Sequence, residues 1–583
     1  MPEVRRPKNA KKKLRAAERA TPAAPRKPAT HWWIYAAAAV ALCAAYLVYA
    51  PALGGPFVFD DISLPYGTPG FPNPLRFWIG GVRPLLMFSY WVNSRFSPAP
   101  DGFHVINLLC HLLNTVLIFF ITRKIARKLL QPDSPDWLLP AFAAAVFLFH
   151  PIQTEAVSYI AGRSECLSVL FFLAAFAVFL YRRAPAVSWK VAIAVLVLFA
   201  AAVATKEHTL VLPALLLLTD YYWNPGAAFS GMRRNWRLYV PIAFGAAVGA
   251  VFVARILAHN GSAGFGMKDL TWYQYFFTEC RAFFVYLRLL VFPAGQSIDW
   301  DYPISRNITD HGAIFGLAAI LVLVAAAIYF RRRYPLASYG FLVYVLLMAP
   351  TSSFVPIKDP LAERRLYLPM IGMLLVAMAA LARLRVDRRK LAAALCGIVA
   401  VLGFLTYQRN QLWASEAALW EDAARQSPGR QRVLSQLAHT YFTNGRCLDA
   451  IAKYTEAARV APPDYGLLID WGLSYDCADQ PDAAVAKLRE AASLNPTAHA
   501  YSQIAMVYAK RSRWQEALQA LDLAGKLDAN YDMIYDNRGG IRAKTGDLAG
   551  AADDYRHAVA LNPANEHARH MLEIVERQLN SRQ

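Results

Sequence analysis

"WWIYAAAAVALCAAYLVY", residues 32–49, is the apolar run that sets the fold class of this chain. About 20 helical residues, each rising about 1.5 Å, cross a hydrocarbon core of ~30 Å, so this run predicts a membrane-spanning helix. It is longer than the apolar core of a typical signal peptide and has no convincing cleavage site, so we expect it to remain as a span.

The loop after this run, GGPFVFDD at residues 54–61, carries two adjacent carboxylates to the membrane surface. Its glycines and prolines, with Pro51, end the helix. Near hydrocarbon each carboxylate loses hydration and disfavours the other's charge, so Asp60 and Asp61 are candidates for a general base or for metal ligands. An ordinary solvated turn or a helix cap uses the same pair, and that alternative remains open.

The composition indicates a polytopic membrane protein with a further domain attached. The chain has 583 residues, 56% hydrophobic and 17% charged, which is too apolar for a soluble protein and too long for one domain. The net charge of +20 gathers in short clusters between apolar runs, where the positive-inside rule explains it without a nucleic-acid partner. Among the 7 cysteines none has zinc-ligand spacing, and Cys447 and Cys477 could pair in an oxidising compartment.

The basic clusters also predict the topology. Residues 1–30 form a disordered, basic, cytoplasmic tail, and placing the other clusters on the same side gives about eleven spans. Residues 272–292 are left over as a re-entrant, interfacial or paired short-helix segment, and residues 84–97 lie along the outer interface. The expected spans are 32–52, 103–122, 137–154, 164–181, 187–205, 207–223, 237–257, 312–330, 335–350, 366–383 and 390–408.

With an odd number of spans, the polar residues that look out of place fall at the outer ends of the helices. A charge at mid-bilayer costs roughly 2.5–3.5 kcal/mol, so such groups line a cavity or lie near an interface. We expect one shared polar site, although charged solvated loops are the plainer alternative. The residues are Asp60, Asp61, His150, Glu155, Arg163, Glu165, Lys206, Glu207, His208, Asp299, Asp301, Lys358, Asp359, Glu363, Arg364 and Arg365.

A repeat organises the polar C-terminal part. Ala450, Ala484, Ala517 and Ala551 recur about every 34 residues, each with a small residue twelve before it and an alanine seven after it. Small residues let the two helices of a hairpin approach closely, and proline ends the second helix. The pattern resembles the tetratricopeptide repeat and predicts a superhelix with a concave groove.

The expected fold is therefore all-α, a multispanning helical membrane domain followed by a tetratricopeptide superhelix. The domains are predicted as a tail at 1–30, a membrane domain at 31–409, a connecting helix at 410–429 and the repeats at 430–583.

The whole pattern resembles the transmembrane, tetratricopeptide-containing O-mannosyltransferase family, which belongs to the GT-C-type glycosyltransferases. Its short repeat array and its Ala- and Arg-rich composition suggest a bacterial member. The motifs that carry the resemblance are Phe57–Asp61, Arg83–Leu85, His104, Asn107 and His111, His150-Pro151, Thr154–Val157, Gly162–Glu165, Lys206-Glu207, Ser297–Asp299 and Ala362–Pro369.

The resemblance implies transfer of a sugar, expected to be mannose, from a polyprenyl-phosphate donor to a Ser or Thr hydroxyl of a translocated protein, with inversion. Asp60 or Asp61 would be the base, with Asp60 slightly favoured. Arg364 and Arg365 would bind the leaving phosphate, with Arg163 and Lys206 as second choices. In the alternative, each cation only pairs with a nearby Glu363, Glu165 or Glu207. The supporting polar residues are His150, Glu155, Glu165, Glu207, Glu363 and Arg83.

No cofactor is expected; a divalent metal on the two aspartates is the less favoured alternative. The expected partners are the lipid-linked donor, an acceptor polypeptide in the repeat groove and membrane lipids. The expected location is a bacterial inner membrane with periplasmic repeats, or the endoplasmic reticulum membrane in a eukaryote, where Asn260 and Asn307 fit the N-glycosylation pattern. The alternatives are a polysaccharide- or lipid-modifying glycosyltransferase and a non-catalytic scaffold.

Overall fold

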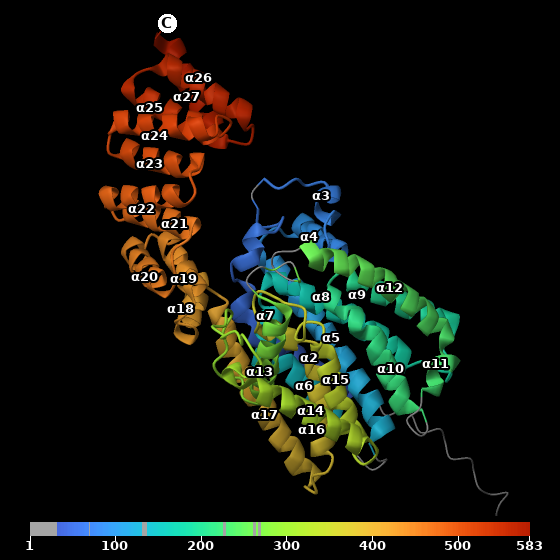
Figure 1. Ribbon diagram of the computed structural model, residues 1–583. Helices are drawn as coiled ribbons and strands as arrows, with labels where there is room; N and C mark the ends of the chain where they lie inside the picture. Colours follow the sequence, from blue (N-terminus) through green and yellow to red (C-terminus); the bar gives the residue numbers. More distant parts are fainter. Residues whose placement is uncertain are drawn as a thin grey trace, which may run out of the picture. The chain divides into compact units, whose positions relative to one another are not determined.

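The computed structural model describes residues 32–68, 70–130, 137–224, 229–259, 264, 265, 267 and 270–582. All regular secondary structure in these ranges is helical (Figure 1). The expected disordered tail and Asn260 lie outside the described residues. The chain separates into two units, Met1–Leu47 and Val48–Gln583. The boundary falls inside α2 (Trp32–Leu53), and everything below concerns the second unit.

The expected spans all coincide with helices. Four helical stretches, Pro100–Leu129, Ile160–Leu180, Asp310–Arg332 and Arg388–Leu412, are long and apolar enough to cross a membrane, and a bent pair makes up to five. Other apolar helices are shorter, so the chain is a membrane protein but the count of about eleven stays a prediction. The helices are α5 (Pro100–Leu129), α6 (Leu138–Phe149), α7 (Thr154–Val157), α8 (Arg163–Leu180), α9 (Trp189–Val203), α10 (Leu212–Trp223), α12 (Trp236–His259), α14 (Ala313–Tyr329), α15 (Pro335–Met348), α16 (Met370–Leu381) and α17 (Arg388–Leu412).

Two segments that the topology left unassigned are helices as well. Residues 272–292 form one continuous helix, α13 (Trp272–Val291), so the expectation of a short-helix pair is wrong. Thr271 Oγ1 accepts a hydrogen bond from Gln274 N, and Gln274 Oε1 accepts one from Thr271 N, which starts this helix in a capping box. Residues 84–97 contain α4 (Pro84–Phe96), which follows the short α3 (Leu75–Ile79).

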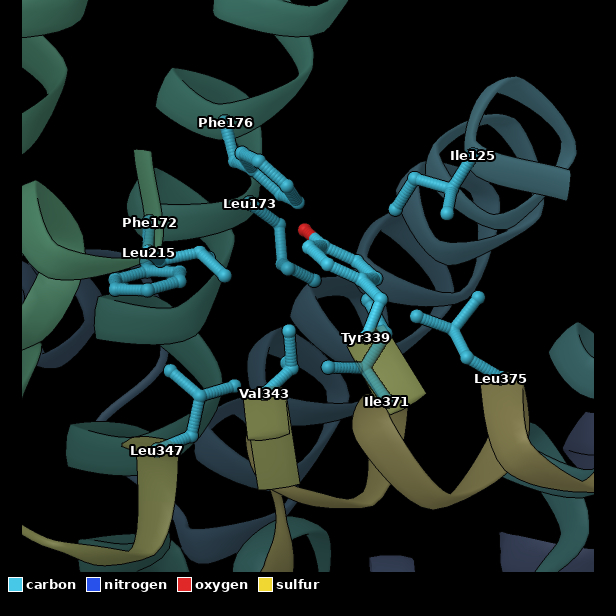
Figure 2. A pocket seen from close by; sticks show the side chains of 10 residues that line it. All are labelled: Ile125, Phe172, Leu173, Phe176, Leu215, Tyr339, Val343, Leu347, Ile371 and Leu375. Carbon is cyan, nitrogen blue, oxygen red and sulfur yellow. The ribbon is translucent and has the colours of Figure 1, made fainter. Parts of the chain in front are cut away.

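The interior of the membrane domain is tightly packed. α15 and α16 touch at two glycines: a Cβ on Gly340 would lie 2.6 Å from the Gly372 carbonyl oxygen, so neither position admits a side chain. Figure 2 shows a gap between α5, α8, α10, α15 and α16 that is lined by aliphatic and aromatic side chains. Its volume of about 10 Å³ is at the lower limit for one water molecule, so it is a packing gap and no substrate site.

The C-terminal part consists of successive antiparallel hairpins (Figure 1). Ala450, Ala484, Ala517 and Ala551 are all 0% exposed, and a Cβ on Gly472 would lie 2.8 Å from Leu488 Cγ. The small residues therefore lie where the paired helices approach most closely, and the repeat prediction is confirmed. The helices are α19 (Gln431–Thr443), α20 (Cys447–Val460), α21 (Tyr465–Cys477), α22 (Pro481–Leu494), α23 (Ala498–Lys510), α24 (Trp514–Leu527), α25 (Asp532–Thr545), α26 (Leu548–Leu561) and α27 (Glu566–Arg582).

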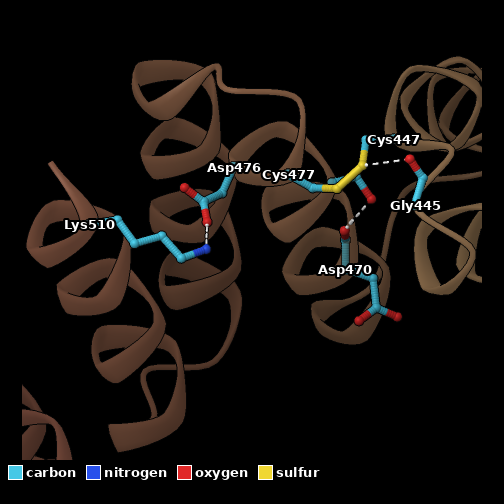
Figure 3. The surroundings of a disulfide bond; sticks show 7 residues. Gly445, Cys447, Asp470, Asp476, Cys477 and Lys510 are labelled. Atoms are coloured by element: carbon cyan, nitrogen blue, oxygen red, sulfur yellow. Dashed lines mark hydrogen bonds and ion pairs between the residues drawn. A yellow bond between two sulfur atoms is a disulfide. The ribbon is translucent and has the colours of Figure 1, made fainter.

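A disulfide joins the first two hairpins. Cys447 opens α20 and Cys477 ends α21, with Cα atoms 5.8 Å apart, and their sulfur atoms are bonded (Figure 3). Asp476, beside Cys477, forms an ion pair with Lys510 of the third hairpin. The pairing that the sequence allowed is thus present in the structure.

Charged residues connect the repeats to loops of the membrane domain. Arg432 donates to both Asp299 oxygens, at 2.5 and 2.7 Å, and to Asp359 Oδ1 at 2.7 Å. Arg430 reaches the same two carboxylates at 3.3 Å each. Burial alone would raise the pKa of Asp359, but Arg432 and Arg430 lower it. Next to this clamp, α18 (Glu416–Gln426) occupies the expected connecting segment.

Candidate functional site

The two aspartates lie in a short 3₁₀ helix, η1 (Phe59–Ser63), and their environments differ. Asp61 is 0% exposed and accepts hydrogen bonds from Tyr66 Oη at 2.7 Å, Ala161 N at 2.9 Å and Val58 N at 3.1 Å. Burial raises its pKa to about 7 in spite of these donors. The buried Asp61 carboxylate therefore joins residues 58–66 of this loop to the segment around Ala161.

The Asp60 carboxylate, by contrast, is exposed and has no hydrogen-bond or ion-pair partner within the described part of the chain. Its backbone N–H donates to Tyr159 Oη at 3.0 Å. The preceding residue, Phe59, has φ of +53°, a left-handed conformation that a bulky side chain adopts only when its surroundings impose it. Its ring packs on Trp420 of α18, with centroids 4.4 Å apart. Backbone and ring contacts thus fix the position of a free carboxylate.

Three cation–carboxylate pairs lie on loops and helix ends that belong to the same polar cluster. Arg83 binds Glu207 through Nε and Nη2, both at 2.9 Å. Lys206 pairs with Glu165, and Arg364 pairs with Glu155, whose other oxygen accepts from Arg364 N at 2.9 Å. The pairs join segments far apart in sequence: the loop before α4, α7, the start of α8, η4 (Glu207–Val211) and η7 (Glu363–Leu366).

In each pair the cation is more exposed than its carboxylate. The side-chain exposures are 39% against 28% for Arg83 and Glu207, and 15% against 7% for Lys206 and Glu165. For Arg364 and Glu155 they are 33% and 5%. Each cationic side chain is therefore less buried than the carboxylate that it pairs with, and a partly exposed cation can still bind an anion.

The electrostatics link these pairs to one another and to the aspartates. Burial lowers the pKa of the Lys206 ammonium, Glu165 raises it, and the charges of Arg83 and Arg364 lower it. Burial also raises the pKa of the Tyr159 phenol; the Asp61 and Asp60 carboxylates raise it further, while Arg364 lowers it. The Tyr159 hydroxyl thus lies within electrostatic reach of both Asp60 and Arg364.

Several expected site residues have other partners. Arg163 is 0% exposed and donates to Asn93 Oδ1 at 2.6 Å, Asn107 Oδ1 at 2.9 Å and the Phe103 carbonyl at 3.0 Å. These bonds use most of its donors inside the protein, so Arg163 orders the packing of α4, α5 and α8. This geometry speaks against the second-choice role on a donor phosphate.

Arg365 and Glu363 turn away from the cluster around Tyr159. Arg365 donates to the carbonyl of Asp359 at 2.5 Å and to Tyr275 Oη at 3.0 Å. Glu363 accepts from Ser297 N at 2.8 Å, and burial raises its pKa to about 7. Arg365 therefore does not lie beside Arg364 as a second phosphate ligand. Arg365 binds Tyr275 and Asp359, whereas Arg364 binds Glu155.

His150 has the helix-end role that its position before Pro151 favours. Its Nδ1 accepts from Ile152 N at 3.2 Å, and Nε2 lies 3.2 Å from the Leu290 carbonyl, so it joins α6 to α13. Residues that the sequence did not single out are Tyr159, which accepts a hydrogen bond from Asp60 N and interacts electrostatically with Arg364, and Tyr66, which donates to Asp61. The only available signal was a tyrosine inside a short polar segment, which is too common to be specific.

The alternative that each cation pairs with Glu363, Glu165 or Glu207 holds for Lys206, which pairs with Glu165, and does not hold for Arg364, whose partner is Glu155. Lys206 binds Glu165 rather than the adjacent Glu207, and Arg364 binds Glu155 rather than the adjacent Glu363. The pairs run between loops, so they assemble a site in addition to ordering single loops. Within the described residues no three His, Cys, Asp or Glu side chains gather as a metal site would require. The expectation about a metal stays untested.

Known proteins that resemble the chain over most of its length are protein O-mannosyl-transferases. F38B6.6 of Caenorhabditis elegans is 25% identical over 438 residues, 71% of this chain and 61% of the relative. TMTC3 of Mus musculus is 24% identical over 589 residues, 89% of this chain and 63% of the relative. The chain thus spans about three fifths of the length of these relatives, and the resemblance inferred from the motifs is confirmed.

Other comparisons concern parts of the chain. TMTC1 of Mus musculus is 33% identical over 161 residues, 24% of this chain and 16% of the relative. The structure of YrrB, a TPR protein with an unusual peptide-binding site, is 18% identical, covers 31% of this chain and 89% of that chain, and has a TM-score of 0.24. No protein-family model matches the chain.

Proposed function

We propose that this chain, which is similar to the TMTC protein O-mannosyl-transferases, is a membrane glycosyltransferase. It transfers a sugar, most simply mannose, from a polyprenyl-phosphate donor to a Ser or Thr hydroxyl of a protein, with inversion. The observation that carries the proposal is the arrangement around Tyr159. The Tyr159 hydroxyl accepts a hydrogen bond from the backbone of Asp60, whose carboxylate is free, and it also interacts electrostatically with the partly exposed Arg364.

Asp60 is the general base of the proposed reaction. Its carboxylate takes the proton of the acceptor hydroxyl while the hydroxyl oxygen forms a bond to the anomeric carbon. The bond from that carbon to the phosphate oxygen breaks, and its electron pair leaves with the lipid phosphate. Asp61, with its buried and hydrogen-bonded carboxylate, is a positioning residue.

Arg364, Lys206 and Arg83 stabilise the negative charge on the leaving phosphate. Guanidinium and ammonium groups bind phosphate oxygens through charge-assisted hydrogen bonds. Glu155, Glu165 and Glu207 hold the three cations in place from behind, so little reorganisation is needed when the phosphate gains charge. This assignment replaces Arg365 and Arg163 by Arg83.

The acceptor chain approaches from the side of the repeats. Arg430 and Arg432 bind the loops that follow α13 and α15, and Phe59, next to Asp60, packs on α18, so the first repeats lie beside the loop that carries Asp60. We infer that the repeats bind the acceptor polypeptide and face away from the cytoplasm. In a bacterial cell this is the periplasm.

The direct test is transfer of radiolabelled mannose from polyprenyl-phosphate mannose to a Ser/Thr-rich protein by the purified full-length chain in vesicles. For Asp60→Asn we expect a loss of about 100-fold or more in kcat, because a general base contributes roughly 10²–10⁴-fold. The matched control is Asp101→Asn, which removes an exposed carboxylate at the start of α5 and leaves the rate unchanged. Full activity of the Asp60 variant contradicts the assigned role.

A further inference from the structure

A charged cavity lies at the other ends of helices that reach the candidate site. Its volume is about 570 Å³, and its lining comes from the ends of α5, α8 and α10 and the segments after α8 and α10. It shares no residue with the site around Tyr159. The lining includes Lys124, Lys128, Tyr181, Arg182, Arg183 and Trp223.

Helix lengths place this cavity at the opposite membrane surface. On α5, His104 begins the polar end and Lys124 lines the cavity, which at about 1.5 Å per residue is a separation of roughly 30 Å. On α8, Arg163 and Leu180 stand at opposite ends in the same way. The distance matches a hydrocarbon core of ~30 Å, so the two polar regions belong to two different membrane surfaces.

The lining is cationic without a matching number of anions. It contains six Lys or Arg side chains and no Asp or Glu. Arg182 is neutralised from behind by Asp220, at 3.1 Å, and Arg234 donates to Asn224 Oδ1 at 2.9 Å. Lys128 and Arg183 are exposed, and neither has a hydrogen bond or ion pair with the described residues. Lys128 and Arg183 therefore bring positive charge to the cavity that no described side chain pairs with.

Two aromatic residues, Tyr181 and Trp223, are also part of the lining. Lys124 lies over the Tyr181 ring, with Nζ 5.1 Å from the centroid, and Trp223 ends α10. Tyr and Trp favour the depth of lipid headgroups, where the ring contacts hydrocarbon and the polar atom stays hydrated. A lining that combines cations with Tyr181 and Trp223 fits a phosphate group that is attached to an apolar chain.

We propose that this cavity binds a phosphate-bearing anion at the surface opposite the candidate site. Basic pockets between membrane helices bind phospholipid headgroups in this way. A soluble polyphosphate shares the same chemistry, and the experiment distinguishes the two sources. The positive-inside rule alone explains cations on this surface but gives no reason for a cavity that collects them.

The test measures binding of dioleoyl phosphatidylglycerol, of dioleoyl phosphatidylcholine and of pyrophosphate to the purified full-length protein by native mass spectrometry. The binding variant is Lys128→Gln with Arg183→Gln. The matched control is Arg332→Gln with Arg389→Gln, which removes two exposed cations of other basic clusters that do not line the cavity. A charge-preserving variant, Lys128→Arg with Arg183→Lys, checks that the substitutions themselves do no harm.

We expect phosphatidylglycerol to bind the wild type better than phosphatidylcholine and to bind the first variant about 25-fold more weakly, since each cation near the surface contributes roughly five-fold. The control and the charge-preserving variant should bind like the wild type. Pyrophosphate binding that depends on Lys128 and Arg183, without a preference for phosphatidylglycerol, assigns the site to a soluble phosphate. Equal loss in the first variant and in the control, or no binding of either phosphate probe, overturns the proposal.

Discussion

At the residue level, the neighbours Asp60 and Asp61 divide two tasks between them. Asp61 is buried and ties the loop to Tyr66 and Ala161, whereas Asp60 stays exposed behind the strained Phe59. The sequence predicted that one of them is a base and favoured Asp60 only slightly. The distinction depends on Ala161 and Tyr159, which are about a hundred residues away. No local pattern around the aspartates contains that information.

Two raised carboxyl pKa values predict how stability depends on pH. Burial raises the pKa of both Asp61 and Glu363 to about 7, above the ordinary values of about 4 in the unfolded chain. The folded state therefore binds more protons between about pH 4 and 7, and stability falls as the pH rises through this range. The expected result is a lower midpoint of thermal unfolding at pH 7.5 than at pH 5 for the detergent-solubilised protein.

The comparison that isolates these groups uses Asp61→Asn with Glu363→Gln. Neutral side chains remove the two titrations, so the difference between the midpoints at pH 5 and pH 7.5 should shrink relative to the wild type. Asp101→Asn, at an exposed position, should leave that difference unchanged. An identical pH dependence in the double variant would show that other groups control it.

Arg364 allows a second prediction at the same scale. Its backbone N–H and its guanidinium both bind Glu155, so the side chain is oriented before a phosphate arrives. Arg364→Lys keeps the positive charge but replaces the planar guanidinium, which can donate two parallel hydrogen bonds, by an ammonium group. We expect kcat with the polyprenyl-phosphate donor to fall about 10-fold or more and membrane insertion to be unchanged. Arg288→Lys on α13, whose guanidinium donates to the Ala294 carbonyl, should retain the wild-type rate.

At the level of elements, the repeats were predictable and the loop contacts were not. The alanine positions repeat because each helix pair has the same closest approach, and a periodic structure leaves a periodic sequence. The contact of Phe59 in η1 with Trp420 in α18 is a single contact and not part of a repeat, so no periodicity in the sequence indicates it. The prediction from basic clusters left residues 272–292 without a span, because it placed every cluster on one side of the membrane. In the structure these residues form α13, one helix of 20 residues.

The contact between Phe59 and Trp420 predicts that the connecting helix holds the catalytic loop. Phe59→Gly removes the ring and the steric cost of φ +53°, so the loop gains freedom although its backbone is no longer strained. We expect about 10-fold lower kcat without loss of thermal stability. Ile62→Gly, an exposed position in the same 3₁₀ helix, is the matched control. A wild-type rate for Phe59→Gly would separate the contact from catalysis.

At the level of the whole molecule, the clamp and the disulfide bear on the same question of sidedness. Arg430 and Arg432 bind Asp299 and Asp359, so the loops after α13 and α15 lie on the membrane face that carries the repeats. A disulfide between the first two hairpins persists only in an oxidising compartment. Together they predict repeats outside the cytoplasm and basic clusters inside it, in agreement with the positive-inside rule.

The disulfide between Cys447 and Cys477 allows the location of the repeats to be tested by thiol labelling. In a variant that keeps only Cys447 and Cys477, a membrane-impermeant maleimide should not label the protein in intact spheroplasts until a reductant is added. After reduction both thiols should react from the outside, because the repeats face the reagent. Replacing Arg511 by Cys in α23's following turn, in a background without the other cysteines, gives an accessible control thiol that labels without reductant. Labelling of these thiols only after lysis would place the repeats in the cytoplasm and would remove the site around Asp60 from a translocated acceptor. Labelling of Cys447 and Cys477 in intact spheroplasts before reduction would show that the repeats face outward but that the disulfide is not formed.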